Sequence, residues 1–115
     1  MTDNCLFCKI IKGEIPSKKI YEDEKVFAFD DINPQAPVHI IIIPKKHIQD
    51  LNSLAEGDES ILGHIQSVAA KIALQFPDLK NGYRVVNNCG IDAGQTVFHI
   101  HYHLLGGRSF KWPPG

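Results

Sequence analysis

The stretch that decides the fold is His99-Ile100-His101-Tyr102-His103-Leu104-Leu105. Its histidines alternate with large apolar residues, which is the two-residue period of a β-strand with one buried face. Alternate side chains lie on the same side of a strand, so His99, His101 and His103 are predicted to line one face. The apolar residues then anchor the other face in a core. Histidine titrates near neutral pH and unpaired buried rings are costly, so this face is predicted to be a proton-handling or nucleophilic site.

The segments before this strand predict the rest of an antiparallel sheet and two helices. Further strands are expected at 18–21, 25–30, 38–43 and 83–87, where apolar and β-branched residues are bounded by turns. A short helix is expected over 5–12. A long helix is predicted by apolar residues spaced three or four apart, namely Ile61, Ile65, Val68, Ile72 and Phe76. Asp58 or Ser60 is expected to cap it and Pro77 to end it. The pattern predicts one α+β domain over residues 1–115.

Composition and charge favour a globular protein with small-molecule chemistry. Of the 115 residues, 43% are hydrophobic and 22% charged, the net charge is −1, and the 12 Lys and Arg are scattered. No basic cluster suggests a nucleic acid or membrane partner. The longest apolar run is Ile40 to Ile43, and Met1 to Asn4 lacks the layout of a secretory signal. We therefore expect a cytoplasmic protein.

The loop before the histidine strand favours an anionic ligand. Residues 88–96 contain an amide at Asn88, a hydroxyl at Thr96 and glycines that let backbone N–H groups approach a bound molecule. Beside three histidines, this combination suits a phosphate better than a neutral carbonyl. His39 starts the apolar strand at 38–43, so it is predicted to be at least partly buried and to have a hydrogen-bond partner.

Two cysteines offer a separate metal motif. Cys5 and Cys8 have the spacing of thiols that share a tetrahedral zinc, but two more ligands must come from elsewhere. His39, His47, Cys89 and a histidine of the strand are the candidates. The alternative is a pair of small, half-buried cysteines on one helical turn. A thioredoxin-like redox pair is disfavoured because no βαβ pattern surrounds the motif.

The segment Thr96 to Leu105 resembles the signature of the histidine triad (HIT) superfamily, in which histidines alternate with apolar residues. Other segments resemble its Hint branch: Phe7 to Ile11, Glu14 to Pro16, Phe27 to Ile32, Pro34 to Pro37, Ile43 to Ile48, Gly82 to Arg84, Gly94-Gln95, Gly106 to Arg108 and Trp112 to Gly115. The resemblance covers nearly the whole chain. It implies a HIT-like fold with a five-stranded antiparallel sheet that continues across a homodimer, and a purine nucleoside phosphoramidase.

Carried over by position, the resemblance implies roles for individual residues. His101 would attack the α-phosphorus and become transiently nucleotidylated, His103 would contact the phosphate, and His39 would support them. Asn88, Gly94 and Thr96 would hold phosphate oxygens or the leaving group, and Asp31 the ribose hydroxyls. The apolar slot for the purine would consist of Leu6, Phe7, Ile10, Phe29 and Ile32. Well-known Hint members carry Ser where this chain has Thr96, whose rotamers are more restricted.

The resemblance also implies a structural zinc. Other histidine triad proteins that carry the cysteine pair bind zinc through residues that correspond to Cys5, Cys8, His47 and His99. Such a role would remove His99 from acid–base chemistry and leave catalysis to His101 and His103.

Three candidate functions remain after the resemblance is considered. The favoured one is cleavage of AMP and GMP phosphoramidates, and also of aminoacyl adenylates, through a nucleotidyl-histidine. The alternatives are a nucleotide-binding interaction or scaffold module with incidental hydrolysis, and a diadenosine polyphosphate hydrolase. The C-terminal Trp112-Pro113-Pro114-Gly115 favours the Hint branch over the last of these. The physiological substrate, the choice between adenine and guanine, and protein partners do not follow from the sequence.

Overall fold

The computed structural model describes residues 4–115, in which five antiparallel strands form one sheet. The first three residues, part of the segment used to argue against a secretory signal, lie outside the described range. The strands are β1 (Lys19–Glu22), β2 (Val26–Asp30), β3 (Val38–Pro44), β4 (Tyr83–Val86) and β5 (Tyr102–Gly106). Their order in the sheet is β1-β2-β3-β5-β4, so β3 and β5 are central. The predicted α+β class with a five-stranded antiparallel sheet is confirmed.

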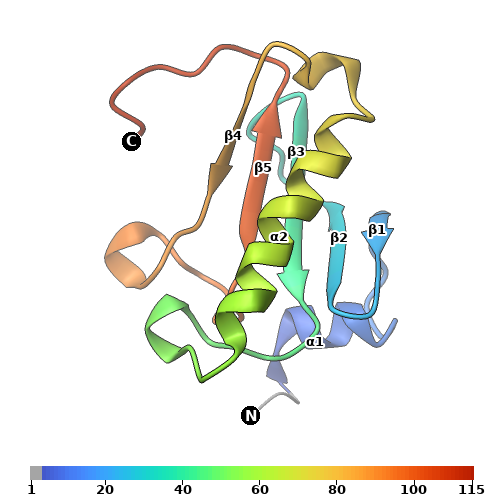
Figure 1. Cartoon of the computed structure of the whole chain (residues 1–115), viewed down its shortest axis with the longest axis vertical. Coiled ribbons are helices and arrows are strands. Elements are labelled where there is room, and N and C mark those ends of the chain that lie inside the picture. Colours follow the sequence, from blue (N-terminus) through green and yellow to red (C-terminus); the bar gives the residue numbers. More distant parts are fainter. Residues whose placement is uncertain (1–3) are drawn as a thin grey trace.

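The long helix α2 (Asp58–Ala73) crosses one face of the sheet (Figure 1). Alternate residues of the strands pack against it, including Ile40 and Ile42 from β3 and Tyr102 and Leu104 from β5. The prediction that Tyr102 and Leu104 anchor the histidine strand in a core is therefore correct. Among the described residues, no helix has both the length and the apolar character that crossing a bilayer requires.

The short helix α1 (Leu6–Ile11) covers the opposite face at one end of the sheet. Its residues Phe7, Cys8 and Ile10 pack with side chains from β2 and β3, namely Phe27, Phe29, Ile41 and Ile43. Further along β3 on this face comes His39. Helix α1 thus leaves the histidine part of the face uncovered, and the site forms there.

The connections are single turns and loops, including η2 (Leu51–Ser53), η3 (Pro77–Leu79) and η4 (Ile91–Ala93). The turn between β1 and β2 is held by the Asp23 carboxylate, which accepts hydrogen bonds from the backbone N–H groups of Lys25 and Val26. His64 of α2 lies 2.6 Å from the same carboxylate. Although burial opposes it, these hydrogen bonds hold the pKa of Asp23 below its usual range.

The long helix and the last strand depart most from the sequence-based expectation, while the other elements differ by one residue at one or both ends. The helix starts at Asp58 and stops at Ala73, because Phe76 before Pro77 adopts an extended backbone. Gly57 rather than Asp58 or Ser60 is at the N-cap position. The last strand begins at Tyr102 and not at His99, because β3 ends at Pro44, which has no N–H to extend the ladder.

Candidate active site and metal centre

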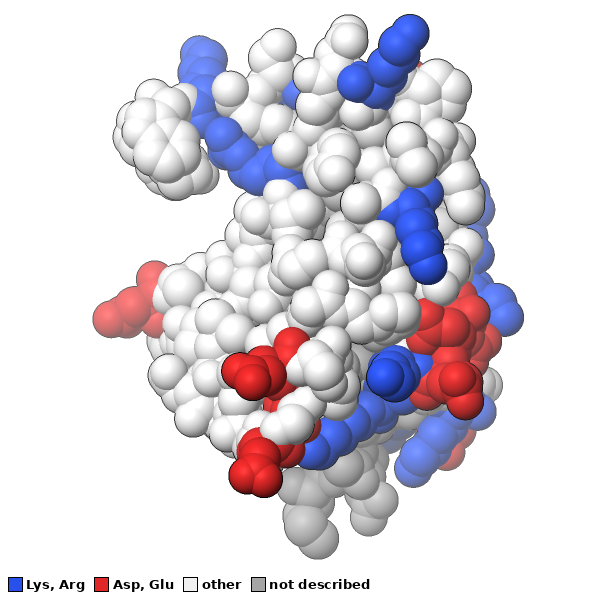
Figure 2. All heavy atoms as spheres, viewed as in Figure 1, with Lys and Arg blue, Asp and Glu red and all other residues white. Residues whose placement is uncertain are grey.

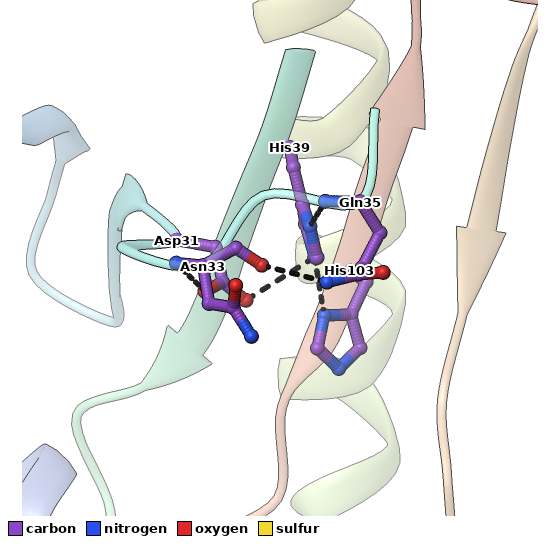
Figure 3. Close-up of polar contacts among 5 residues, drawn as sticks. All are labelled: Asp31, Asn33, Gln35, His39 and His103. Carbon is purple, nitrogen blue, oxygen red and sulfur yellow. Dashed lines mark hydrogen bonds and ion pairs between the residues drawn. The ribbon is translucent and has the colours of Figure 1, made fainter. Parts of the chain in front are cut away.

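The site lies on the face of the sheet opposite α2, where β3 and β5 run side by side. His39 is on β3 and His103 on β5, and their rings point toward each other (Figure 3). The His39 Nε2 atom lies 2.8 Å from His103 Nδ1. His39 is buried, as its position in the apolar strand predicts, and His103 is its partner.

Hydrogen bonds determine which ring nitrogens carry protons in this pair. The backbone N–H of Gln35 donates to His39 Nδ1 at 3.0 Å, so a neutral His39 carries its proton on Nε2. That Nε2–H donates to His103 Nδ1. Neutral His103 must then hold its own proton on Nε2, which makes this atom a hydrogen-bond donor for a ligand.

Asp31 follows β2 and lies beside this pair (Figure 3). One of its carboxylate oxygens accepts a hydrogen bond from the backbone N–H of Asn33 at 2.8 Å. The other lies 3.3 Å from His39 Nε2. Asp31, which is predicted to bind the ribose hydroxyls, therefore contacts His39, which is predicted to support the other histidines. The sequence analysis does not predict this contact.

His101 lies next to His103, and their ring centroids are 5.1 Å apart. The rings of His101 and of Phe7 in α1 make a T-shaped contact with a centroid distance of 5.0 Å. His101 Nδ1–H donates to the backbone carbonyl of His99 at 2.9 Å, which leaves the lone pair of a neutral ring on Nε2. A nucleophilic nitrogen and the N–H donor of His103 are therefore adjacent.

Burial keeps these rings neutral. Desolvation lowers the pKa of His39 and of His101. Desolvation, with the nearby His101 and His39 charges, lowers the pKa of His103 to about 4. Near neutral pH, His101 can therefore act as a nucleophile without first losing a proton.

The predicted metal ligands form a second cluster, between α1 and the end of β3. The atoms of Cys5, Cys8, His47 and His99 that could bind a metal all lie within 4.8 Å of one another. His99 Nδ1 is 3.3 Å from Cys5 Sγ, 3.5 Å from Cys8 Sγ and 3.1 Å from His47 Nδ1. Edges of about 3.3 Å between nitrogens and 3.6 Å between nitrogen and sulfur follow from tetrahedral zinc bond lengths. The donor set and its spacing fit such a metal.

The environment of His99 supports the same conclusion. Its side chain is 0% exposed, and its Nε2–H donates to the backbone carbonyl of Pro44 at 2.8 Å. The Nδ1 lone pair then faces the two cysteines, as in metal sites where a ligand histidine is oriented by a carbonyl. In the absence of metal, burial and the neighbouring Cys5 raise the pKa of the Cys8 thiol to about 11.

Asp31, His39 and His103 also lie within 4.8 Å of one another but suit a metal less well. Because His39 Nδ1 accepts a hydrogen bond from the Gln35 N–H, the ring proton of neutral His39 is on Nε2, which therefore has no lone pair for a metal. A metal bound there would have to displace that proton. We therefore treat these three residues as a hydrogen-bonded relay.

His99 connects the two clusters. Its ring belongs to the Cys5–Cys8 cluster, while its backbone carbonyl orients the His101 ring. A metal that fixes His99 would therefore also fix the carbonyl that orients the predicted nucleophile, His101.

The residues predicted to form the purine slot lie in different environments. Phe7, Ile10 and Phe29 are buried together under α1, and Phe7 contacts the His101 ring. Leu6 lies on the exposed side of α1, and Ile32 is 99% exposed. In this single chain these five side chains do not enclose one common slot.

The residues predicted to hold phosphate oxygens or the leaving group also lie in different places. Asn88 lines a cavity of about 270 Å³ together with His39 and His103. Thr96 lines another cavity with Leu6, near the cysteine cluster. Gly94 is the exposed residue after η4, with a φ of 92° that favours glycine.

Four residues at the site are not among the site residues that the sequence predicts: Gln35, Pro44, Arg84 and Arg108. The Gln35 backbone fixes the tautomer of His39, and the Pro44 carbonyl fixes that of His99. Arg84 and Arg108 line the cavity beside His103. Both arginines belong to segments that resemble the Hint branch, and Arg84 sits in a predicted strand, so strand alternation could have placed it on the histidine face.

Comparison with known proteins agrees with this geometry. Residues 12–110 match the model of the HIT domain family. The 14 kDa zinc-binding protein of Zea mays is 57% identical over 114 residues, covering 96% of this chain and 87% of that protein. A HIT family hydrolase from Legionella pneumophila has a TM-score of 0.93 and 51% identity, covering 97% of this chain and all of that one. A histidine triad protein from Clostridium difficile has a TM-score of 0.90 and 49% identity, covering 94% of both chains. With His99 and His101 directly before β5, His103 on β5 and His39 on the neighbouring β3, this chain belongs to the HIT domain family.

Proposed function

We propose that the protein hydrolyses purine nucleoside 5′-phosphoramidates through a nucleotidyl intermediate on His101. The observation that supports this most strongly is the pair of complementary tautomers. His101 has a free Nε2 lone pair, and the neighbouring His103 has an Nε2–H donor. A nucleophile beside a hydrogen-bond donor suits displacement at an anionic phosphorus.

The reaction would take place in two steps. His101 Nε2 bonds to the phosphorus while the bond from phosphorus to the amine nitrogen breaks, and that nitrogen takes up a proton from solvent. His103 Nε2–H hydrogen-bonds the departing group, and His39 holds His103 in the required tautomer. The His99 carbonyl accepts the Nδ1–H of the nucleotidylated ring. Water then attacks the phosphorus, the bond from phosphorus to His101 Nε2 breaks, and the proton that the water loses goes to solvent, which balances the proton taken up by the amine.

Nucleotide binding would place the base toward α1 and the phosphate over the histidines. Phe7 packs with Ile10 and Phe29 and adjoins the His101 ring, which favours a purine slot beside this cluster. The proposal gives the exposed side chains of Leu6 and Ile32 a place at the rim of that slot. Asp31 would accept the ribose hydroxyls, while Asn88, Gly94 and Thr96 would hold phosphate oxygens or the leaving group. AMP, GMP and their phosphoramidates are the proposed partners.

We further propose that Cys5, Cys8, His47 and His99 bind a structural zinc ion. When bound, zinc would cross-link α1 to the segments that follow β3 and precede β5. The spacing of the four ligands and the tautomer of His99 support this assignment.

We also propose a homodimer in which the sheet continues across β4. Strand β4 is an edge strand, and its Tyr83 is partly exposed. Tyr83 and the 88% exposed Leu74 line an apolar cavity beside this edge. A partner strand would satisfy the edge and cover these side chains.

The test is an assay of the purified protein against adenosine and guanosine 5′-phosphoramidates and dinucleoside polyphosphates. We expect turnover of the phosphoramidates, loss of nearly all turnover in His101→Ala, and retention of AMP binding. The control is His64→Gln, which changes a histidine on α2 away from the site. Faster turnover of the dinucleotides would favour the polyphosphate hydrolase, and AMP binding without turnover would favour the binding module.

A further inference from the structure

The uncovered part of the histidine face continues into a cationic cavity. Beside His39 and His103, the cavity of about 270 Å³ is lined by Arg84 of β4 and by Arg108 and Phe110 of the C-terminal segment. In Figure 2 the C-terminal segment overhangs a hollow next to β4, and Lys and Arg atoms lie along the underside of this overhang. None of the nucleotide roles proposed above uses either arginine.

The register of the sheet places Arg84 on the same face as the histidines. Leu105 of β5 pairs with His39 on one side and with Arg84 on the other. Directly paired residues of neighbouring strands share a face, and two strand spacings separate the backbones of His39 and Arg84 by about 10 Å. Arg84 can therefore reach a group bound over His103.

The two guanidinium groups are held in place by the C-terminal segment. The Cζ atoms of Arg84 and Arg108 lie 4.9 Å and 4.3 Å from the centre of the Phe110 ring. Arg84 Nη2–H donates to the Lys111 carbonyl, and Arg108 Nε–H donates to the Gln35 carbonyl. These contacts use only some of the N–H groups of each arginine and orient the planar groups before a ligand arrives.

Neither positive charge is neutralised within the described part of the chain. No carboxylate in residues 4–115 forms an ion pair with Arg84 or Arg108, although Asp78 lines an adjoining cavity with both. Two like charges against one aromatic ring repel each other, and an anion between them would relieve this repulsion. Charge-assisted hydrogen bonds from guanidinium to a carboxylate or phosphate are among the stronger contacts a site can offer.

The position of the arginines indicates which part of a substrate would meet them. Along this face the apolar cluster under α1 comes first, then the histidines, and then the arginines. A nucleotide with its base near Phe7 and its phosphorus at His101 would direct its leaving group toward the arginines. We propose that Arg84 and Arg108 form a subsite for an anionic group on the leaving portion of the substrate. This inference rests on the proposed hydrolase function and specifies its substrate class.

The first test compares two substrates that differ by one charge: the adenosine 5′-phosphoramidates of glycine and of glycinamide. We expect wild-type kcat/KM to favour the glycine compound, and Arg84→Gln or Arg108→Gln to lower this preference about tenfold or more, as the loss of a charged hydrogen bond implies. Arg108→Lys keeps the charge and should keep part of the preference. Lys71→Gln on α2 is the matched control and should leave the preference unchanged, with thermal melts checking that all variants fold.

The second test measures binding without turnover, using AMP and the α,β-methylene analogue of ADP. If wild type binds the analogue more tightly than AMP and both Gln variants lose this difference, the subsite accepts a phosphate. If wild type prefers the glycine substrate to the glycinamide substrate but binds the analogue no more tightly than AMP, the subsite accepts a carboxylate. If wild type turns over neither substrate but shows the binding gain, the hydrolase proposal fails and the subsite stands. If both substrates react equally well and the analogue gains nothing, the subsite is wrong and the hydrolase proposal stands.

Discussion

At the scale of single residues, three similar imidazoles have different roles because their ring nitrogens have different hydrogen-bond partners. The Pro44 carbonyl leaves His99 with a lone pair facing thiols, and the His99 carbonyl leaves His101 with a lone pair on Nε2. His39 leaves His103 with an N–H donor on the corresponding nitrogen. The alternation of histidines in the sequence predicts that they lie together. It does not predict these tautomers, because two of the three partners, Pro44 and His39, lie on other segments.

The lowered pKa values of the buried histidines make a prediction about pH. Each ring acts in its neutral form, so activity is lost only when acid protonates the rings in the folded enzyme. Because burial depresses the pKa of His101, and that of His103 to about 4, kcat/KM should stay on its plateau as pH falls through 6.5 and decline only below it. A pH profile on the glycinamide substrate measures this. An acid limb at or above 6.5 would contradict the assignment of neutral, buried rings.

Asp31 makes a prediction that separates ribose binding from support of the histidines. If its carboxylate accepts the ribose hydroxyls, Asp31→Asn should weaken AMP binding by about 1.5–3 kcal/mol and weaken the dideoxy analogue much less. Asp30→Asn is the control, since Asp30 is the neighbouring carboxylate and pairs with Lys18. Equal losses for both nucleotides would mean that Asp31 acts only through His39 and the local fold.

At the scale of elements, the periodic patterns identified both α-helices and all five strands but not their ends. The ends depend on residues elsewhere: β5 starts at Tyr102 because its neighbour β3 stops at Pro44. The cysteine spacing left several candidates for the remaining ligands open, and only the resemblance selected His47 and His99. Their convergence with α1 depends on the tertiary packing of three segments, which no local pattern encodes.

Zinc binding is the prediction that belongs to these elements. Elemental analysis of protein purified without a metal-affinity step should give about one zinc per chain, and Cys8→Ser should lose it. Free zinc at 100 times its dissociation constant stabilises a fold by about 2.7 kcal/mol, so chelation should lower the melting temperature of wild type but not of Cys8→Ser. Cys89→Ser, outside the cluster, should retain both zinc and the chelator response. Zinc-free wild type under reducing conditions would return the cysteines to a packing role.

At the scale of the whole molecule, the C-terminal segment joins the site to the proposed dimer edge. Pro114 lines the cavity beside His103, and the Arg84 guanidinium holds the Lys111 carbonyl. Trp112 is 82% exposed in the single chain, which is unusual for a side chain of its apolar area unless a partner covers it. In the sequence analysis, this tail serves only to favour the Hint branch and is not placed on the molecule. Its attachment through Arg84, Arg108 and Phe110 follows only from the folded structure.

Removal of the tail tests this arrangement. Deletion of residues 111–115 should change the relative kcat/KM among amine leaving groups, because it removes one wall of the cavity. AMP affinity and the dimer mass measured by light scattering should remain close to wild type. A truncated protein that ranks the amines as the full-length protein does would show that the tail has no role in substrate selection. If the truncation lowers only the melting temperature, the tail serves to stabilise its own protomer.

The central claim is that His101 attacks the phosphorus, and intact-mass spectrometry of the enzyme during turnover tests it most directly. After an alkaline quench of a reaction with adenosine phosphoramidate, we predict a mass increase of one adenylyl group, located by fragmentation on His101. His101→Ala should show neither the increase nor significant turnover, while His64→Gln should show both. An adenylyl group on another residue, or wild-type turnover in His101→Ala, would contradict the account.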